Sequence, residues 1–349
     1  MIFWIRKGDR VTGQKIVTDA VVDIFKNEHT VIFYELSLIY LLSYIKLCMY
    51  ILSGNRRIYF VPSRSRRGSI RDWPLLLLQI FGIELFGHLH GADGYDFLRK
   101  IKSKRLIYFF YKNIKYISPS KHLTDGLELI GYNCSTIENF FQKRSVETVQ
   151  NLNSEEFLKD ETIKEAISAC GGKYVVLWNS NILASKGIIE TLELLYPFGK
   201  RDEVVFIVFG EFVSDAFMTS KELEKRCEIY FELDWVKYLG TRDTSIIDHF
   251  LKFANMVALP SYYPTECQPL SVIAGMVNGL DILIRNSAAL LETVGDYPFV
   301  YYIEDDFGKC FDREMLLDLD PVQAVQGQVD RFDFNRFQNE LRNFLEINS

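Results

Sequence analysis

Short apolar runs alternate with longer stretches of helical character along almost the whole chain. In its first part, apolar runs typical of strands occur at 30–34, 57–61, 83–88, 106–109 and 114–117. The segments between them that are expected to be helical are 14–26, 36–53, 72–81 and 120–130. Strands that alternate with helices predict βαβ units and a parallel sheet.

A second series with the same alternation begins at 173. Its expected strands are 173–178, 204–210, 236–240, 256–260, 281–284 and 299–303. Its expected helices are 186–197, 219–228, 243–253, 269–278 and 287–293. Open parallel sheets of this kind bind their ligands at the carboxyl ends of the strands, so the loops there are the places to look for chemistry.

The polar, charge-rich stretch 143–172 separates the two series. The sequence therefore predicts an α/β chain with two Rossmann-like, doubly wound domains that face a central cleft. We expect an N-terminal domain over 1–152 and a C-terminal domain over 153–330. The tail 331–349 has apolar residues at helical spacing and is expected to form a helix that closes the chain.

Composition is that of a soluble globular protein, with 48% hydrophobic and 25% charged residues in a chain of 349. A net charge of −6 argues against a general nucleic-acid binder. The charge is uneven, however: residues 56–121 hold fourteen Lys and Arg against four acids. This basic part suits an anionic membrane surface or a phosphorylated ligand, and it equally suits a solvated face balanced by an acidic C-terminal half.

The six cysteines are scattered, without a CxxC pair or metal-ligand spacing. Together with an N-terminus that does not look like a signal peptide, they indicate reduced thiols in the cytoplasm. The apolar segment 31–53 is long enough to span a membrane, but Glu35 and Lys46 lie inside it. We therefore expect a buried or interfacial helix there.

Two loops of the first series hold candidate residues. Gly13, in "RVTGQK", would let a phosphate or sugar approach the backbone and the start of the helix 14–26. "FGHLHGADG" follows an apolar strand, and residues two apart on an extended segment point to opposite faces, so a zinc pair is not expected. His90, followed by Gly91, is the candidate for a sugar contact, and His88 is expected to be a packing residue. GxGxxG and Walker motifs are absent, which disfavours a dehydrogenase or a P-loop NTPase.

Two loops of the second series add charged residues. "LWNSNILASKG" places Lys186 at the start of a helix, where its charge would add to the exposed N–H groups in binding a pyrophosphate. The ordinary alternative is a solvated lysine. In "LPSYYPTECQPLSVIAGMVNGL", Pro269 is expected at the first helical position, and the N–H groups of Leu270 and Ser271 would point out of the helix. Leu270, Ile273 and Val277 would form its buried face, which leaves Glu266 to accept hydrogen bonds from sugar hydroxyls.

Taken in order, these segments resemble the nucleotide-sugar glycosyltransferases of family 4, which have the two-domain GT-B fold. The resemblance covers most of the chain. Its motifs are the Gly13 loop, "HLHG", "ISPS", "NFF", "SNILASKG", "VFGE", "YLG" and "LPSYYPTECQPLSVIAGMVNG". The last is similar to the family signature of a Glu, then Gly-x-Pro-Leu, then Glu-Ala-Met-Ala-x-Gly.

The resemblance implies a mostly retaining enzyme that needs no active-site metal and no cofactor beyond a UDP- or GDP-linked sugar donor. Lys186 would neutralise the pyrophosphate, Glu266 would hold hydroxyls of the donor sugar, and His90 would line the sugar pocket. The acceptor, a saccharide or a lipid-linked saccharide, would bind the N-terminal domain. The implied donor-binding residues are Gly13, Ser180, Asn181, Gly210, Gly240, Gln268, Pro269, Leu270, Ser271 and Ala274.

Three positions depart from the family pattern. The second Glu, which usually holds the ribose hydroxyls, is Ala274. The Gly beside the first Glu is Cys267, and the Arg that commonly partners the lysine is Ser180. A lost charged hydrogen bond to a diol costs about 1.5–3 kcal/mol, or roughly ten- to a hundredfold in donor affinity.

The main hypothesis is an active bacterial hexosyl- or N-acetylhexosaminyl-type transferase in surface polysaccharide or glycolipid synthesis, such as that of lipopolysaccharide. It would be cytoplasmic or peripheral at the inner face of the cytoplasmic membrane, with its basic part on anionic lipid. The missing Glu and Arg motivate an alternative, a non-catalytic GT-B binding subunit of a glycosyltransferase complex. Other GT-B reactions, such as those of a sugar-nucleotide epimerase or a phosphorylase, stay open.

Overall fold

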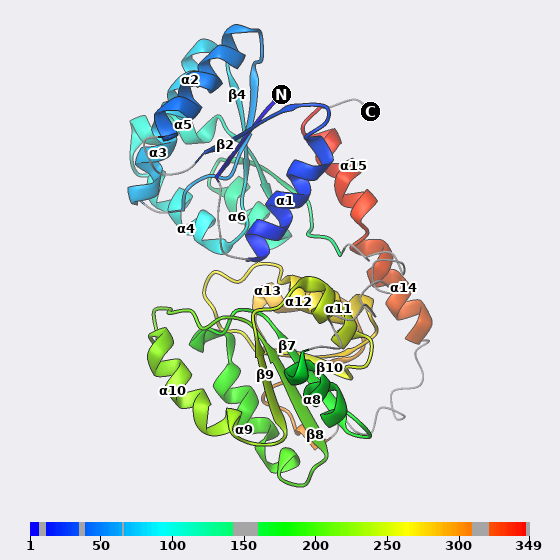
Figure 1. The fold of residues 1–349 in the computed structure, drawn as a ribbon. Helices are drawn as coiled ribbons and strands as arrows, with labels where there is room; N and C mark the ends of the chain where they lie inside the picture. Colours follow the sequence, from blue (N-terminus) through cyan, green and yellow to red (C-terminus); the bar gives the residue numbers. More distant parts are fainter. Residues whose placement is uncertain (7–11, 35–38, 65, 142–159, 309–320, 347–349) are drawn as a thin grey trace. The chain divides into compact units, whose positions relative to one another are not determined.

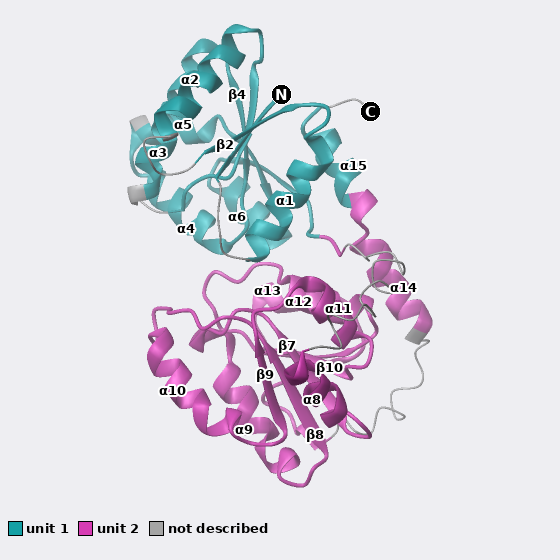
Figure 2. Cartoon of the chain, viewed as in Figure 1, with its two compact units in different colours: residues 1–139, 337–349 teal, residues 140–336 magenta. Residues whose placement is uncertain are grey.

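The computed structural model describes residues 1–6, 12–34, 39–64, 66–141, 160–308 and 321–346. The chain divides into two compact units (Figure 2). Unit 1 comprises Met1–Asn139 together with Phe337–Ser349, and unit 2 comprises Phe140–Arg336. The expected boundary between 152 and 153 lies outside the described residues.

Unit 1 is built on a parallel sheet whose strands follow the order β2-β1-β3-β4-β5-β6 (Figure 1). These strands are β1 (Ile2–Arg6), β2 (Thr30–Tyr34), β3 (Arg57–Phe60), β4 (Glu84–His88), β5 (Lys115–Ser118) and β6 (Asn133–Thr136). The helices between them are α1 (Gly13–Phe25), α2 (Ile39–Leu52), α3 (Arg66–Leu77) with the 3-10 turn η1 (Leu78–Phe81), α4 (Ala92–Ile101), α5 (Arg105–Lys112) and α6 (Lys121–Leu129).

Helices cover both faces of this sheet. On one face, Phe25 of α1 stacks on Phe3 of β1 with ring centroids 4.8 Å apart. On the other, an apolar core joins strand residues such as Ile58 to Leu47 of α2, Leu75 of α3 and Tyr111 of α5. A parallel sheet covered on both faces buries its strands almost completely, which explains their continuous apolar runs.

Unit 2 repeats the plan with the strand order β12-β11-β10-β7-β8-β9. Its strands are β7 (Tyr174–Asn179), β8 (Val204–Phe209), β9 (Val236–Gly240), β10 (Met256–Leu259), β11 (Asp281–Ile284) and β12 (Val300–Tyr302). Its helices are α8 (Glu161–Ala169), η4 (Ala184–Lys186), α9 (Ile188–Gly199), α10 (Ser220–Phe231), α11 (Thr244–Leu251), α12 (Leu270–Val277), α13 (Ala288–Val294) and α14 (Pro321–Arg331).

The last helix, α15 (Phe334–Phe344), begins in unit 2 and ends in unit 1. Phe344 meets Phe86 of β4 edge to face at 5.7 Å, and Arg342 forms two hydrogen bonds to Glu28, of 2.6 and 2.8 Å. Leu341 is fully buried. The tail helix expected from the apolar spacing is therefore present, and it supplies part of the unit 1 core.

Some elements differ from the expectation. The run at 106–109 is not a strand but part of the helix α5. The helices α4, α8 and α14 and the strands β1 and β6 were not expected, and α8 lies within the expected connection 143–172. A strand at 106–109 would be joined to the strand at 115 by a link too short for a parallel crossover, which needs a dozen or more residues. The helix α5 buries Phe110 and Tyr111 and exposes Phe109.

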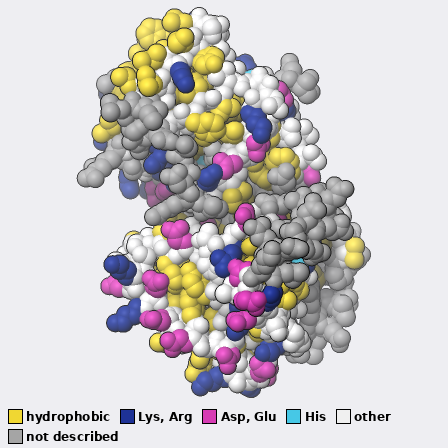
Figure 3. All heavy atoms as spheres, in the orientation of Figure 1, with side chains coloured by type: hydrophobic (Ala, Val, Ile, Leu, Met, Phe, Trp, Pro, Cys, Tyr) yellow, Lys and Arg dark blue, Asp and Glu magenta, His cyan; other side chains and the backbone are white. Residues whose placement is uncertain are grey.

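Hydrophobic side chains gather over α2 at one end of unit 1 (Figure 3). The strand β2 and the helix α2 share the apolar segment 31–53, and residues 35–38 between them are outside the described residues. Among the described helices, none is long and apolar enough to cross a membrane.

The return of α15 to unit 1 yields a stability prediction. Replacing Leu341 by Ala should lower the free energy of unfolding by about 2–5 kcal/mol, because it opens a cavity in a filled core. The exposed neighbour Asn343, replaced by Ala, is the control and should change it by less than about 0.5 kcal/mol. Denaturant unfolding followed by tryptophan fluorescence measures both. Equal effects would show that α15 does not belong to the unit 1 core.

Candidate functional site

The strand order of unit 2 reverses beside β7, the first strand of that unit. From β7 the sheet grows to β8 and β9 on one side, and β10 pairs with β7 on the other. Val176 and Leu177 of β7 lie opposite Met256 and Val257 of β10. Where the order reverses, the loops after the two central strands leave a crevice at the carboxyl edge of the sheet. The loops of Lys186 and Glu266 are the two that follow β7 and β10.

The loop after β7 turns sharply at Gly187, which ends η4 and has a φ of +84°. A Cβ at Gly187 would lie 2.6 Å from the carbonyl oxygen of Pro260, which directly follows β10. Only glycine satisfies both the positive φ and the close approach. The backbone N–H of Tyr262 also donates to the carbonyl of Ser185 at 2.8 Å. These contacts join the two loops.

Asp215 fixes the same turn from the loop after β8. Its Oδ2 accepts hydrogen bonds from the backbone N–H of Ser185 at 2.8 Å and from the Ser185 hydroxyl at 2.6 Å. Its Oδ1 accepts from the N–H groups of Phe217 and Met218. Partial burial raises the pKa of Asp215, but these hydrogen bonds outweigh it and leave the pKa below its usual value. The carboxylate is therefore a fixed anchor for the residue before Lys186.

Lys186 and Glu266 meet at this junction. The Nζ of Lys186 lies 3.8 Å from Oε2 of Glu266, and the two side chains are only 16% and 14% exposed. Each charge has a hydroxyl partner: Lys186 Nζ donates to Ser180 Oγ at 2.7 Å, and Ser261 Oγ donates to Glu266 Oε2 at 3.0 Å. Both charges are thus held in place by short contacts, while the ion pair between them is long.

The expected glycines line the same edge of the sheet. Gly210 has a φ of +130°, and a Cβ there would lie 2.1 Å from the carbonyl oxygen of Ser180 and 3.2 Å from the Cα of Asn181. The N–H of Gly210 donates to the carbonyl of Gly240 at 3.0 Å. Gly210 therefore allows the loop after β8 to pack against Ser180 and Asn181, with Gly240 beside it.

The helix α12 begins one residue later than expected. Pro269 is its N-cap, with a φ of −72°, and Leu270 is the first helical residue. By helix geometry the N–H groups of Leu270, Ser271 and Val272 have no partner within the helix. The expected single buried face is also wrong, because Ser271–Met276 are all buried and Leu270 and Val277 only partly so. The helix packs against β10, β11, α13 and α14, so it has little solvent-facing side.

Several of the expected donor contacts on this segment are enclosed. Gln268 and Ser271 are buried, and Ala274 is only 6% exposed. The carbonyl of Ala274 accepts a hydrogen bond of 2.7 Å from the side chain of Asn278. A longer side chain at 274 would have to extend from a packed position.

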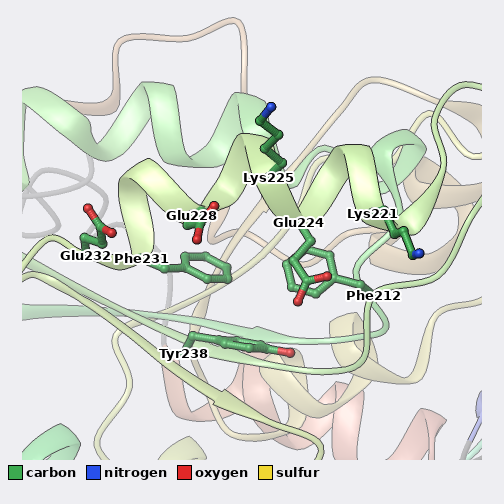
Figure 4. Close-up of a pocket in the computed structure, with 8 residues that line it drawn as sticks. All are labelled: Phe212, Lys221, Glu224, Lys225, Glu228, Phe231, Glu232 and Tyr238. Atoms are coloured by element: carbon green, nitrogen blue, oxygen red, sulfur yellow. The ribbon is translucent and has the colours of Figure 1, made fainter.

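An open groove of about 610 Å³ lies between α10 and β9 (Figure 4). Its floor is aromatic: Phe231 stacks on Tyr238 at 4.8 Å, and Phe212 lies 5.7 Å from Tyr238. The hydroxyl of Tyr238 donates to the carbonyl of Gly210 at 3.1 Å. The groove therefore adjoins the loop that packs against Ser180. The charged residues on its α10 side are Lys221, Glu224, Lys225, Glu228 and Glu232.

His90 and Gly13 belong to unit 1. The rings of His88 and His90 stack with centroids 4.1 Å apart, so the prediction that they point to opposite faces is wrong. The reason is that β4 ends at His88, and strand alternation does not extend to His90. His88 is fully buried, as expected of a packing residue, and its Nδ1 lies 2.6 Å from the hydroxyl of Tyr59.

His90 has the features expected of a ligand contact. Its Nε2 is enclosed and has no hydrogen-bond partner among the described residues, and the same holds for Nε2 of His88. Burial lowers the pKa of His88 to about 3. Burial, with the charges of His88 and Arg64, also lowers the pKa of His90. Both rings are neutral at pH 7.

Gly13 is the first residue of α1, after the N-cap Thr12, whose side chain accepts from the N–H of Lys15 at 3.2 Å. The residues 7–11 before it lie outside the described part of the chain. No group of three or more His, Cys, Asp or Glu that could hold a metal ion occurs in the described ranges. The five cysteines described, at 48, 134, 170, 227 and 267, are free thiols.

Three residues of the unit 2 site were not expected from the sequence. Asp215 and Ser261 fix the turn of Lys186 and the carboxylate of Glu266. Arg285, after β11, lies over the ring of Tyr262 at 5.4 Å from its centroid. Asp215 and Arg285 belong to no motif with fixed spacing, and Ser261 lies within "LPSYYPTECQPLSVIAGMVNGL" but was not singled out there. The one sequence feature that could have pointed to them is that each follows a buried strand, at the edge of the sheet where ligands bind.

No family model matches the sequence, and no curated protein matches it. Solved structures do match over nearly the full length. HepE from Anabaena, crystallised with UDP, has a TM-score of 0.71 and 14% identity, with 99% of each chain covered. Sucrose-phosphate synthase from Thermosynechococcus elongatus has a TM-score of 0.67 and 13% identity, with 99% of this chain and 98% of that chain covered.

WaaG, a glycosyltransferase involved in lipopolysaccharide biosynthesis, has a TM-score of 0.62 and 11% identity, with 99% of each chain covered. These proteins have the GT-B fold, and the match includes both units of the present chain. Sequence identities this low establish the fold alone. The expected fold class is confirmed: the chain has the two-domain α/β fold of the GT-B glycosyltransferases.

Proposed function

We propose that the protein is a retaining glycosyltransferase that moves a sugar from a nucleoside-diphosphate donor to a saccharide or lipid-linked saccharide acceptor. One observation carries this proposal: Lys186 and Glu266 are held together, largely enclosed, at the point where the strand order of unit 2 reverses. A cation, a carboxylate and the first N–H groups of α12 at such a point provide partners for a diphosphate and for sugar hydroxyls.

In the proposed reaction, the bond between the anomeric carbon and the diphosphate oxygen breaks while the acceptor hydroxyl attacks from the same face. The hydroxyl gives up its proton, and the nucleoside diphosphate leaves with additional negative charge. The ammonium of Lys186 and the N–H groups at the start of α12 would stabilise that charge, so the residues present do not require a metal ion for this step. Glu266 would accept hydrogen bonds from the donor sugar.

UDP is the proposed nucleotide of the donor, with GDP as the second choice. HepE was crystallised with UDP, with UDP-glucose, and with UDP and glucose, on the same fold. The acceptor would bind unit 1, where the neutral imidazole of His90 presents an enclosed Nε2 without a protein partner. The similarity to WaaG, a glycosyltransferase involved in lipopolysaccharide biosynthesis, supports a role in surface glycolipid synthesis.

The alternative, a non-catalytic GT-B subunit, is favoured by Ser180 and Ala274. The argument from Ser180 is weakened by the structure, because the Ser180 hydroxyl accepts a hydrogen bond from Lys186 and so orients the ammonium in place of the usual arginine. Ala274 still provides no charge for a ribose. A subunit without activity would bind a nucleotide sugar, or a partner protein, without turnover.

Removal of either charge tests the reaction. Lys186→Ala and Glu266→Ala should each lower the rate of donor hydrolysis by roughly a hundredfold or more, because each removes a fixed group that stabilises the donor or its leaving charge. The assay measures release of nucleoside diphosphate from a panel of common nucleotide sugars.

Lys200→Ala, at the far end of α9, and Glu193→Ala, on its exposed face, are matched controls and should retain the wild-type rate. No turnover by the wild-type protein with any donor, together with tight binding of a partner protein, would support the non-catalytic alternative. Equal loss in variants and controls would refute the assignment of this site.

Ala274→Glu tests the position of the ribose. A carboxylate there should tighten binding of a nucleoside diphosphate by roughly ten- to a hundredfold, because it adds a charged hydrogen bond to the diol. Since Ala274 is packed, the same change should lower the stability of the free protein. Calorimetric titration measures the affinity, and Ala274→Gln, which lacks the charge, should gain less. Unchanged or weaker binding by Ala274→Glu would mean that the ribose lies elsewhere.

The neutral histidines of unit 1 predict a loss of stability in acid. Their folded-state pKa values lie below the unfolded value of 6.5, so the unfolded chain binds more protons as the pH falls. Their contribution is complete above pH 6.5 and declines toward the folded pKa, which for His88 is about 3. Between pH 6.5 and 5 the free energy of unfolding should fall by about 2 kcal/mol for His88, and His90 should add to the fall. Denaturant unfolding should show a smaller decline in His90→Gln, and an equal decline would contradict this.

A further inference from the structure

The helix α2 of unit 1 exposes an apolar face. Its outward side chains include Leu41, Ile45, Met49 and Leu52, which are 66%, 51%, 64% and 86% exposed. They recur at helical spacing along one side, and Leu42 lies beside them. Among the exposed side chains described for α2, Lys46 is the one that carries a charge. A helix that is apolar all round is normally buried, so we expect another molecule to bind this exposed face.

The opposite face of α2 is already used. Leu47 and Ile51 are buried in the unit 1 core, and the hydroxyl of Tyr40 donates to the carbonyl of Arg71 in α3 at 2.7 Å. The helix therefore cannot turn its outer residues inward without breaking the core. The apolar face is a permanent feature of folded unit 1.

The apolar surface extends beyond α2. Arg56, after α2, donates to the carbonyl of Phe81 in η1 at 3.4 Å, and Gln79 of η1 donates to the carbonyl of Phe110 in α5 at 3.1 Å. These contacts place η1 beside the segment that follows α2 and beside α5. We call the exposed apolar side chains of α2, η1 and their neighbours the α2 surface, part of which is seen in Figure 3. Besides the α2 residues, its exposed apolar side chains are Leu77, Ile80, Phe81 and Phe109.

The charges around the α2 surface are mainly positive, and the exposed acid that follows η1, Glu84, is paired with Arg57 and Lys115. Within 39–83 and 102–112 the sequence has one acid, Asp72, and it is buried beside Arg71, with Oδ1 3.0 Å from Nε. The exposed cations are Lys46, Arg56, Lys102, Lys104, Arg105 and Lys112. A second copy of this surface would bring like charges together, which is unfavourable. An anionic lipid surface satisfies both features, because headgroups pair with the cations and acyl chains accept the apolar residues.

We propose that the α2 surface docks unit 1 on the surface of an anionic lipid bilayer. The helix lies in the plane of the interface with Leu41, Ile45 and Met49 in the acyl boundary, and the cations contact headgroups. This inference deepens the proposed function by naming where a lipid-linked acceptor would be met. Lipid binding itself does not depend on that function.

Vesicle flotation with the full chain tests the docking. The wild-type protein should bind vesicles of phosphatidylcholine mixed with phosphatidylglycerol, bind pure phosphatidylcholine much more weakly, and be released by high salt. Leu41→Glu/Met49→Glu should weaken binding at least about tenfold, because it places two carboxylates in the apolar contact. Ile229→Glu in unit 2 is the matched control, with the original residue also 66% exposed, and should bind as wild type. Far-UV circular dichroism checks that the variants fold.

A second readout uses the native Cys48, which is exposed on α2 while Cys134, Cys227 and Cys267 are buried. In a Cys170→Ser/Cys310→Ser background, a polarity-sensitive dye on Cys48 should shift to the blue with anionic vesicles. The same dye on Ile229→Cys, with Cys48→Ser added, should not shift. Absence of vesicle binding, equal binding to neutral and anionic vesicles, or a dimer that Leu41→Glu/Met49→Glu dissociates would each overturn the proposal. Donor hydrolysis by the same variants should be unchanged, which separates this test from that of the proposed function.

Discussion

The close contact between Gly187 and Pro260 is the constraint on which the unit 2 site depends. It forms where the strand order reverses, so two loops far apart in the chain leave neighbouring strands at one edge of the sheet. A side chain at 187 would separate these loops, and with them Lys186 and Glu266. The hydrogen bond from Tyr262 to Ser185 and the anchoring of Ser185 by Asp215 maintain the same junction.

The two charges at this junction are fixed in position, but the ion pair between them is long enough to leave both able to bind a ligand. Their head groups are 3.8 Å apart, and each has a serine hydroxyl at hydrogen-bond distance. Both side chains are largely enclosed, so water screens their charges only weakly. A ligand bound to them would therefore interact more strongly than it would in open water. The hydroxyl of Ser180 also explains how the site orients its lysine without an arginine.

Alternation of strands and helices allowed most of the fold to be predicted, because buried parallel strands such as β8 have continuous apolar sequences between amphipathic helices. The run at 106–109 misled because a short apolar run looks alike in a strand and in a buried helix. The stacking of His88 on His90 was missed because the strand ends between them, and strand ends are the least reliable part of such a prediction.

For the site, the resemblance assigned Lys186 and Glu266 to the same donor, and the structure brings the two side chains to 3.8 Å because they follow strands that pair. Asp215, Ser261 and the hydroxyl contact of Ser180 could not be predicted. Asp215 reaches Ser185 from another loop, and no spacing along the chain encodes that contact. The hydroxyls of Ser261 and Ser180 contact Glu266 and Lys186 within the same loops, but the loop conformations that bring them together are not encoded by a recognisable pattern. The α2 surface was visible as an apolar segment, but its exposure followed only from the packing of Leu47 and Ile51 on the sheet.

The central claim is that a nucleoside diphosphate binds where β7 and β10 end. A crystal structure of the protein with UDP tests it most directly. The account predicts the diphosphate within hydrogen-bond distance of Lys186 Nζ and of the N–H groups of Leu270 and Ser271. A diphosphate bound elsewhere, with Lys186 still held by Ser180 and Glu266 and touching no phosphate, would contradict it.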